Sequence, residues 1–190
     1  MQREQLKIEY SHNGKPHEVV LTALRQGFFQ EAAKQEGLRS LNGEALVKAM
    51  LEYADGAILR VERFKNGLRH DGPNGEYAVA EYGKRGQLTD ASRYKDDKRD
   101  NGPNGEPAFQ KFNAEGRRTY IVYYNNGMRH DGPNGEPAEQ IRDDHGNFVF
   151  VSRFTSDNRT HRFSVDEMRA LEQESKAAAA KKTKPQQPKL

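Results

Sequence analysis

A phrase of ten residues recurs at a constant distance along this chain. Residues 69–78 read RHDGPNGEYA, residues 99–108 read RDNGPNGEPA and residues 129–138 read RHDGPNGEPA, so successive copies lie 30 residues apart. Other positions follow the same step and keep one chemical character: Gly56, Gly86, Gly116 and Gly146; Phe64, Tyr94, Tyr124 and Phe154; Val61, Ala91, Ile121 and Val151. A fixed period of this length predicts repeated units that pack against their neighbours, closed by an atypical last unit, SDNRTHRF (156–163).

Each unit is predicted to be a β-hairpin. In the first unit AILRVERF (57–64) is rich in branched and aromatic residues, NG (66–67) is a strong two-residue turn signal, and EYAVAEY (76–82) alternates in polarity. Pro73 has no N–H to donate, so DGPNGE is predicted to be a bulge or wide loop that interrupts the second strand. Hairpins packed edge to edge would form one antiparallel meander and bury the aromatic positions. Tyr124→Ala is therefore expected to cost ~3–5 kcal/mol.

The stretches YADG (53–56) and RFKNGLRHDG (63–72) resemble the MORN repeat, which combines an aromatic residue, NGxxHG and a closing YxDG. They are also similar to YwqK-type antitoxin repeats and to phage repeats of the form NGxxHRxDGPA. The resemblance covers about residues 53–163, and the period exceeds the MORN period by about the length of the DGPNGE insertion. It implies a hairpin-repeat platform that mostly binds other proteins, with membrane lipid sometimes proposed as a ligand, and it implies no catalysis.

Both flanks of the repeats are predicted to cap them. Residues 6–22 are typical of a further hairpin, residues 24–37 and 42–53 of helices, and residues 164–181 of a helix opened by a Ser164–Glu167 capping box. The predicted fold class is α+β, mainly β: an antiparallel meander of four 30-residue MORN-like hairpin repeats between these caps. The predicted regions are an N-terminal hairpin-plus-helix cap (1–52), the repeats (53–163), a C-terminal helix (164–182) and a flexible basic tail (183–190).

Charge and composition narrow the class of protein. The formal net charge is +3, but residues 176–190 hold five lysines and no acidic residue, which leaves 31 − 5 = 26 basic against 28 acidic residues in 1–175. A net charge of −2 on the body argues against a dedicated nucleic-acid domain. The chain has no cysteine, which excludes disulfides and thiolate chemistry. It has neither a signal-like leader nor an apolar run of about 18 residues, so a cytoplasmic protein is expected.

Candidate catalytic groups are sparse. His70-Asp71 and His130-Asp131 suggest a metal-dependent hydrolase, but the middle copy reads Asp100-Asn101 and no further ligands converge. DGPNGE lacks the ligand spacing of an EF-hand calcium loop. A catalytic pair among His145, His161, Asp143, Asp144 and Asp157 competes with ordinary turn chemistry. We therefore expect no enzyme activity, no metal and no cofactor, and keep a hydrolase as the third hypothesis.

The leading hypothesis is a non-enzymatic protein-binding module, a small inhibitor of the antitoxin, immunity or phage anti-defence type that blocks a partner enzyme through its β-repeat surface. Arginine and tyrosine are enriched at interaction hot spots. The alternatives are a solvated face with long side-chain stems, and nucleic-acid binding by the tail together with the arginines at 63, 93 and 153. Homo-oligomer formation stays open. The predicted partner-binding residues are Arg63, Arg93, Tyr120, Tyr123 and Arg153, and the nucleic-acid alternative uses Lys176, Lys181, Lys182 and Lys184.

Overall fold

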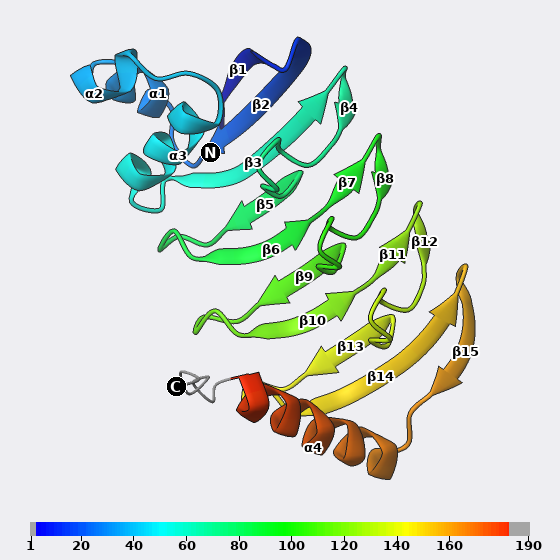
Figure 1. Ribbon diagram of the computed structural model, residues 1–190. Helices are drawn as coiled ribbons and strands as arrows, with labels where there is room; N and C mark the ends of the chain where they lie inside the picture. Colours follow the sequence, from blue (N-terminus) through cyan, green and yellow to red (C-terminus); the bar gives the residue numbers. More distant parts are fainter. Residues whose placement is uncertain (1–2, 183–190) are drawn as a thin grey trace, which may run out of the picture.

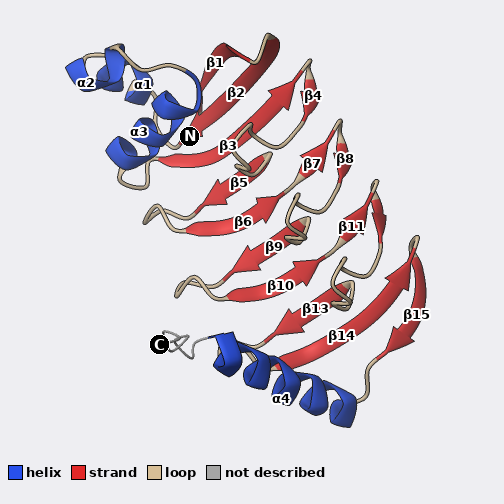
Figure 2. Cartoon of the chain, in the orientation of Figure 1, coloured by secondary structure: helices blue, strands red, loops and turns tan. Residues whose placement is uncertain are grey.

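A computed structural model describes residues 3–182, which form one large antiparallel sheet with helices near both of its ends (Figures 1 and 2). In pairing order the strands are β1 (Glu4–His12), β2 (Lys15–Ala23), β3 (Ile58–Lys65), β5 (Val79–Tyr82), β6 (Leu88–Ser92), β9 (Phe109–Phe112), β10 (Arg118–Val122), β13 (Glu139–Arg142), β14 (Phe148–Thr155) and β15 (Asn158–Arg162). An eleventh strand, β4 (Leu68–Arg69), pairs with β3. The prediction of a mainly β, antiparallel meander followed by a C-terminal helix is confirmed.

Two short ribbons and four helices complete the described chain. The ribbons are β7 (Tyr94–Lys95) with β8 (Lys98–Arg99), and β11 (Tyr124–Asn125) with β12 (Met128–Arg129). The helices are α1 (Phe28–Ala32), α2 (Glu36–Arg39), α3 (Gly43–Ala54) and α4 (Val165–Lys182). Figure 1 places α1–α3 beside β1–β3 at one end of the sheet and α4 against β14 at the other. The predicted tail, residues 183–190, lies outside the described residues.

Short turns with left-handed backbone produce the hairpins. Asn66 and Gly67 have φ angles of 52° and 78° between β3 and β4. Both central residues of a type I′ turn need positive φ, which Asn and Gly accept readily. The β7–β8 turn uses Asp96 and Asp97, with φ angles of 51° and 63°, because a short polar side chain also tolerates this region. The local turn chemistry therefore matches the antiparallel pairing.

Successive strands place the same chemical positions side by side. Residues directly opposite one another on paired strands share one face of the sheet, whereas successive residues along a strand alternate between the two faces. One row of buried residues crosses the sheet from strand to strand: Val61, Ala80, Ala91, Gln110, Ile121, Gln140 and Val151. We call the face that carries this row the helix face, because the core under α1 and α3 includes its first two members. The opposite face is called the open face.

The open face holds the aromatic column predicted to be buried. Phe154 is only 2% exposed, but Phe64, Tyr94 and Tyr124 are half-buried. The expectation that stacking buries all four rings is therefore wrong for three of them. These rings lie on the face opposite the helices, where Arg69 and Arg99 lie over Tyr94 and Arg99 lies over Tyr124 without fully enclosing either ring.

The C-terminal helix begins with the predicted capping box. The Ser164 N–H donates to the Glu167 carboxylate at 2.7 Å, and the Glu167 N–H donates to Ser164 Oγ at 3.3 Å. These bonds hold the pKa of Glu167 below its usual range. The Glu172 carboxylate accepts the N–H of Phe148, which ties α4 to β14.

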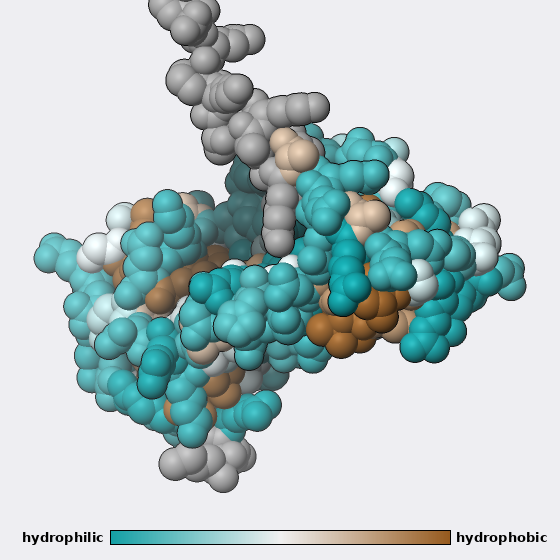
Figure 3. Space-filling view, turned by 90° about the horizontal axis from the view of Figure 1, so that it is seen from below, coloured by the Kyte–Doolittle hydropathy of each residue, from teal (hydrophilic) through white to brown (hydrophobic). Residues whose placement is uncertain are grey.

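Seen from below, the surface is mostly hydrophilic with separate hydrophobic patches (Figure 3).

Within residues 3–182, no helix has the length and apolar character needed to cross a membrane.

Candidate functional site

The repeated loops fasten each hairpin to the one that follows. The Asp71 carboxylate accepts the N–H of Ala78 in its own unit at 3.1 Å and the N–H of Tyr94 in the next hairpin at 3.1 Å. Asp131 accepts the two equivalent N–H groups at 3.0 and 3.1 Å. In the middle copy, the side-chain oxygen of Asn101 accepts the N–H of the following hairpin at 3.0 Å. The recurring phrase therefore joins neighbouring hairpins through side chain to backbone bonds.

Two arginines predicted to bind a partner point into this framework. Arg93 donates to the Asp71 carboxylate at 2.7 Å and to the carbonyl of Gly75 at 3.0 Å. Arg63 donates to both carboxylate oxygens of Glu44 in α3, at 2.7 and 2.9 Å. Only 7% of Arg63 and 6% of Arg93 is exposed. Both guanidinium groups therefore hold elements of the fold together.

Tyr123 occupies the equivalent arginine position of the third unit and is also buried. Its neighbouring loop carries the neutral Asn101, whereas Asp71 and Asp131 face arginines in the other two copies. Burial raises the pKa of Asp71, and the Arg93 guanidinium opposes this effect. A carboxylate buried without its guanidinium would be uncompensated. This cost explains why the unit that has Tyr123 in place of arginine also has the neutral Asn101 in place of aspartate.

The prediction that Arg63, Arg93 and Tyr123 lie on an accessible surface is wrong, because all three side chains are buried. Arg153 is more open: 34% of its side chain is exposed while it donates to Asp131 at 2.5 Å. The half-buried Tyr120 donates its hydroxyl to Glu139 at 2.6 Å. A binding role for these last two stays a prediction. Lys184 lies outside the described residues, and the side chains of Lys176, Lys181 and Lys182 are not among those described.

A different set of arginines lies on the open face. We define the arginine column as Arg69, Arg99, Arg129 and Arg159, which are spaced 30 residues apart. Each lies directly across its hairpin from one residue of the aromatic column: Phe64, Tyr94, Tyr124 and Phe154 respectively. The 30-residue step already marked these positions in the sequence. Sequence reasoning missed them because positions 63, 93 and 153 also repeat arginine at the same 30-residue step.

Arg99 is the centre of this column. Its guanidinium carbon lies 5.8 Å from the Tyr94 ring centre, 4.9 Å from that of Phe109 and 5.6 Å from that of Tyr124. Its Nε donates to the Tyr94 hydroxyl at 3.3 Å. These distances fit cation–π contacts, which fix the guanidinium without neutralising its charge. The column thus combines flat aromatic surface with positive charge.

Acidic side chains balance only part of the open face. In the described chain, no carboxylate lies within ion-pair distance of Arg99, Arg159 or Arg162. The N-terminal half of the face is instead paired, and it encloses a small depression of about 220 Å³. The pairs are Arg60 with Glu62 and Glu81, Arg69 with Glu62, and Lys111 with Asp90. Arg129 in the C-terminal half is also paired, with Glu139 at 3.7 Å and Asp157 at 3.3 Å, so the unpaired positive charge of this face lies at Arg99, Arg159 and Arg162.

Three histidines gather near the tip of the N-terminal hairpin. The His17 ring is stacked on Tyr10 with centres 5.4 Å apart and meets His12 edge-on at 6.0 Å. Together with His12 and His17, His70 lines a depression of about 320 Å³. The Nδ1 atom of His70 lies 3.1 Å from the Asp96 carboxylate. Burial lowers the pKa of His17, and Lys65 and the neighbouring histidines act in the same direction. Within residues 3–182, no three His, Asp or Glu side chains are grouped closely enough to hold a metal ion.

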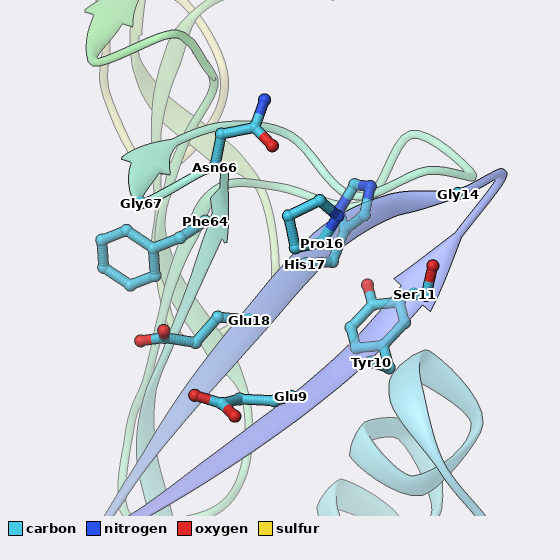
Figure 4. Close-up of a pocket in the computed structure, with 10 residues that line it drawn as sticks. All are labelled: Glu9, Tyr10, Ser11, Gly14, Pro16, His17, Glu18, Phe64, Asn66 and Gly67. Carbon is cyan, nitrogen blue, oxygen red and sulfur yellow. The ribbon is translucent and has the colours of Figure 1, made fainter.

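A shallow depression of about 640 Å³ crosses the same hairpin (Figure 4). Figure 4 shows the Glu9 and Glu18 carboxylates extending to the same side, away from Tyr10 and His17. Consecutive strand residues face opposite sides of a sheet, so Glu9 and Tyr10 do not converge on one ligand. The arginine column therefore remains the strongest candidate site.

Comparison of the chain with protein-family models, curated proteins and solved structures gives no match.

Proposed function

We propose that this chain is a non-enzymatic protein-binding module built from four 30-residue hairpin repeats of the MORN-like or YwqK-type kind. The observation that carries the proposal is the arginine column with its aromatic partners on the open face. Partly exposed arginine and tyrosine beside aromatic rings provide the contact chemistry of interaction hot spots. Inhibition of a partner enzyme in the cytoplasm is the action that the repeat resemblance suggests.

The mixed charge of the face favours a protein partner. A nucleic-acid groove presents positive charge along its length, whereas Glu62, Glu81 and Asp90 interrupt the positive charge here. A protein with an acidic patch and an apolar rim would match both the paired half and the unpaired arginines. The expected partner surface is therefore acidic opposite Arg99 and Arg159.

The test compares two variants that lose the same charge. Arg99→Gln with Arg159→Gln changes the open face, and Lys34→Gln with Lys48→Gln changes exposed positions on the helical cap. Each tagged protein is passed over nuclease-treated native lysate, and the affinity of the captured protein is then measured. We expect the open-face variant to bind at least about tenfold more weakly than the control. Equal affinities would contradict the assignment of the face, and a lysate that yields no nuclease-resistant partner would reject protein binding.

The second candidate function is nucleic-acid binding. It is favoured by one observation: Arg99, Arg159 and Arg162 have no carboxylate partner among the described residues, and each lies over an aromatic ring. Together with the lysines of residues 176–190, this predicts binding that weakens steeply with salt and is reduced in a 1–175 truncation. Binding that is independent of salt would reject this candidate.

A further inference from the structure

One edge of the large sheet is long and unpaired. β1 is the terminal strand in the pairing order and bonds only β2. All nine of its residues pair with β2 in continuous register, from Glu4 opposite Ala23 to His12 opposite Lys15. The strand has no proline, no glycine and no bulge. Such an edge presents a full row of unused backbone groups to another strand.

The opposite edge is protected by its own sequence. β15 has five residues, its pairing with β14 is interrupted between Arg153 and Phe154, and it contains Arg159 and Arg162 without ion-pair partners in the described chain. Short length, a bulge and charge are the usual means of blocking edge pairing. On β1 the central Lys7 is instead neutralised by Glu9 at 2.9 Å and Glu18 at 2.7 Å. Of the two edge strands that the large sheet has within residues 3–182, only β1 is therefore free to pair.

The turn that joins β1 to β2 determines which backbone groups point outward. Asn13 and Gly14 form a two-residue turn with φ angles of 52° and 72°, which makes His12 and Lys15 a hydrogen-bonded pair. Hydrogen-bonded and non-hydrogen-bonded pairs alternate along an antiparallel ladder. Because His12 belongs to a hydrogen-bonded pair, the backbone groups of the even-numbered residues of β1 bond β2. The position of Pro16 fits this pattern, because Ser11 opposite it needs no N–H partner. The outward backbone groups therefore belong to Gln5, Lys7, Glu9 and Ser11.

The sequence of this edge complements itself. A two-fold axis through Ile8 pairs residue i of one strand with residue 16 − i of the other, which is the register that overlaps all nine residues of Glu4–His12. Axes through Lys7 or Glu9 would place like charges opposite one another. Centred on Ile8, the opposing pairs are Lys7 with Glu9, Leu6 with Tyr10, Gln5 with Ser11 and Glu4 with His12.

We propose that the chain forms a two-fold symmetric homodimer by antiparallel pairing of β1 with β1 of a second copy, centred on Ile8. The outward groups of Lys7 bond those of Glu9 across the axis, and those of Gln5 bond those of Ser11. The axis is normal to the sheet, so the two sheets become continuous and both open faces lie on the same side. The dimer thereby presents two arginine columns to one partner surface.

Complementary charge reversals test this pairing. In Lys7→Glu both strands of a dimer would carry Glu at 7 and 9, and in Glu9→Lys both would carry Lys. A mixture of the two variants restores opposite charges at every pair. Sedimentation velocity is measured from about 1 to 500 μM for the wild type, each variant, the mixture and the control Lys48→Glu.

We expect the wild type and Lys48→Glu to dimerise alike. Each β1 variant alone should bind at least about tenfold more weakly, and the mixture should recover dimers that contain one copy of each. Monomers throughout the concentration range for the wild type, or a mixture no better than its components, would overturn the proposal.

Hydrogen exchange on the wild-type protein tests the same interface without relying on the folding of any variant. In wild-type protein the amides of Gln5, Lys7, Glu9 and Ser11 should become protected as concentration rises, while those bonded to β2 change little. Unchanged exchange at these four amides in a sample that sediments as a dimer would place the interface elsewhere.

Discussion

Replacing Asp71 by Asn tests the most buried joint between two hairpins. The substitution keeps the oxygen that accepts the Ala78 and Tyr94 N–H groups, so only the charge opposite Arg93 is lost. Arg93 is 6% exposed and cannot recover the lost interaction from water. Removing one partner of a buried pair costs about 3–5 kcal/mol, and the retained hydrogen bonds place Asp71→Asn near the lower end, at about 3 kcal/mol.

Asp131→Asn is the matched control. It makes the same chemical change opposite Arg153, whose side chain is 34% exposed and can be solvated. We therefore expect a loss of only about 1 kcal/mol. The double variant Asp71→Asn/Arg93→Tyr reproduces the natural Asn101–Tyr123 combination and should be more stable than Asp71→Asn alone. Urea denaturation followed by circular dichroism measures all three, with m-values compared to confirm a common transition.

Two outcomes would refute this reasoning. Equal losses for Asp71→Asn and Asp131→Asn would mean that burial of the arginine does not control the cost. A double variant less stable than Asp71→Asn would mean that Asn101 and Tyr123 do not compensate one another.

Three further predictions concern packing, backbone and pH. Phe154→Ala should cost about 3–5 kcal/mol and the half-buried Tyr124→Ala about 1–2 kcal/mol in the same assay, and a larger loss at 124 would contradict the assigned exposures. Gly56→Ala should be more destabilising than Gly116→Ala by at least about 1 kcal/mol: both have positive φ, but only at Gly56 would a Cβ collide with a backbone carbonyl of the β5–β6 turn. Since folding lowers the pKa of His17 below 6.5, the unfolded chain binds this proton more tightly, and stability should fall as pH decreases through and below 6.5. His17→Phe should flatten that dependence between pH 7.5 and 5.5 in thermal melts, and an unchanged slope would assign it to other groups.

The meander was predictable because its signals are local. Asn-Gly turns, alternating strands and the Ser164–Glu167 box each act within a few residues, and the structure contains them where the sequence indicates. The accessible residues were less predictable. The 30-residue step identifies equivalent positions but not the face that the intervening loops cover, and for this reason the sequence predicts Arg63 and Arg93 as surface residues although the structure buries them.

The sequence does contain one signal that Arg93 is buried: two equivalent positions change together from one unit to the next. The step that replaces Arg93 by Tyr123 also replaces Asp71 by Asn101, which indicates contact between the two positions. When an arginine and a loop residue are replaced together, as here, the arginine is expected to pack against that loop and not to face solvent. The arginine column at 69, 99, 129 and 159 shows no such paired change, because arginine occupies all four positions.

The loop contacts also determine how this sheet assembles in time. Bonds between consecutive hairpins join residues 22, 23 and 28 positions apart, and the same separations return in the later units. Folding rates of small proteins fall as the mean sequence separation of contacts rises. Here that separation does not grow with the number of strands. A nascent chain can therefore add each of these hairpins to the previous one as it emerges, whereas the β2–β3 pairing, which joins His17 to Lys65, must wait for the helical segment between them.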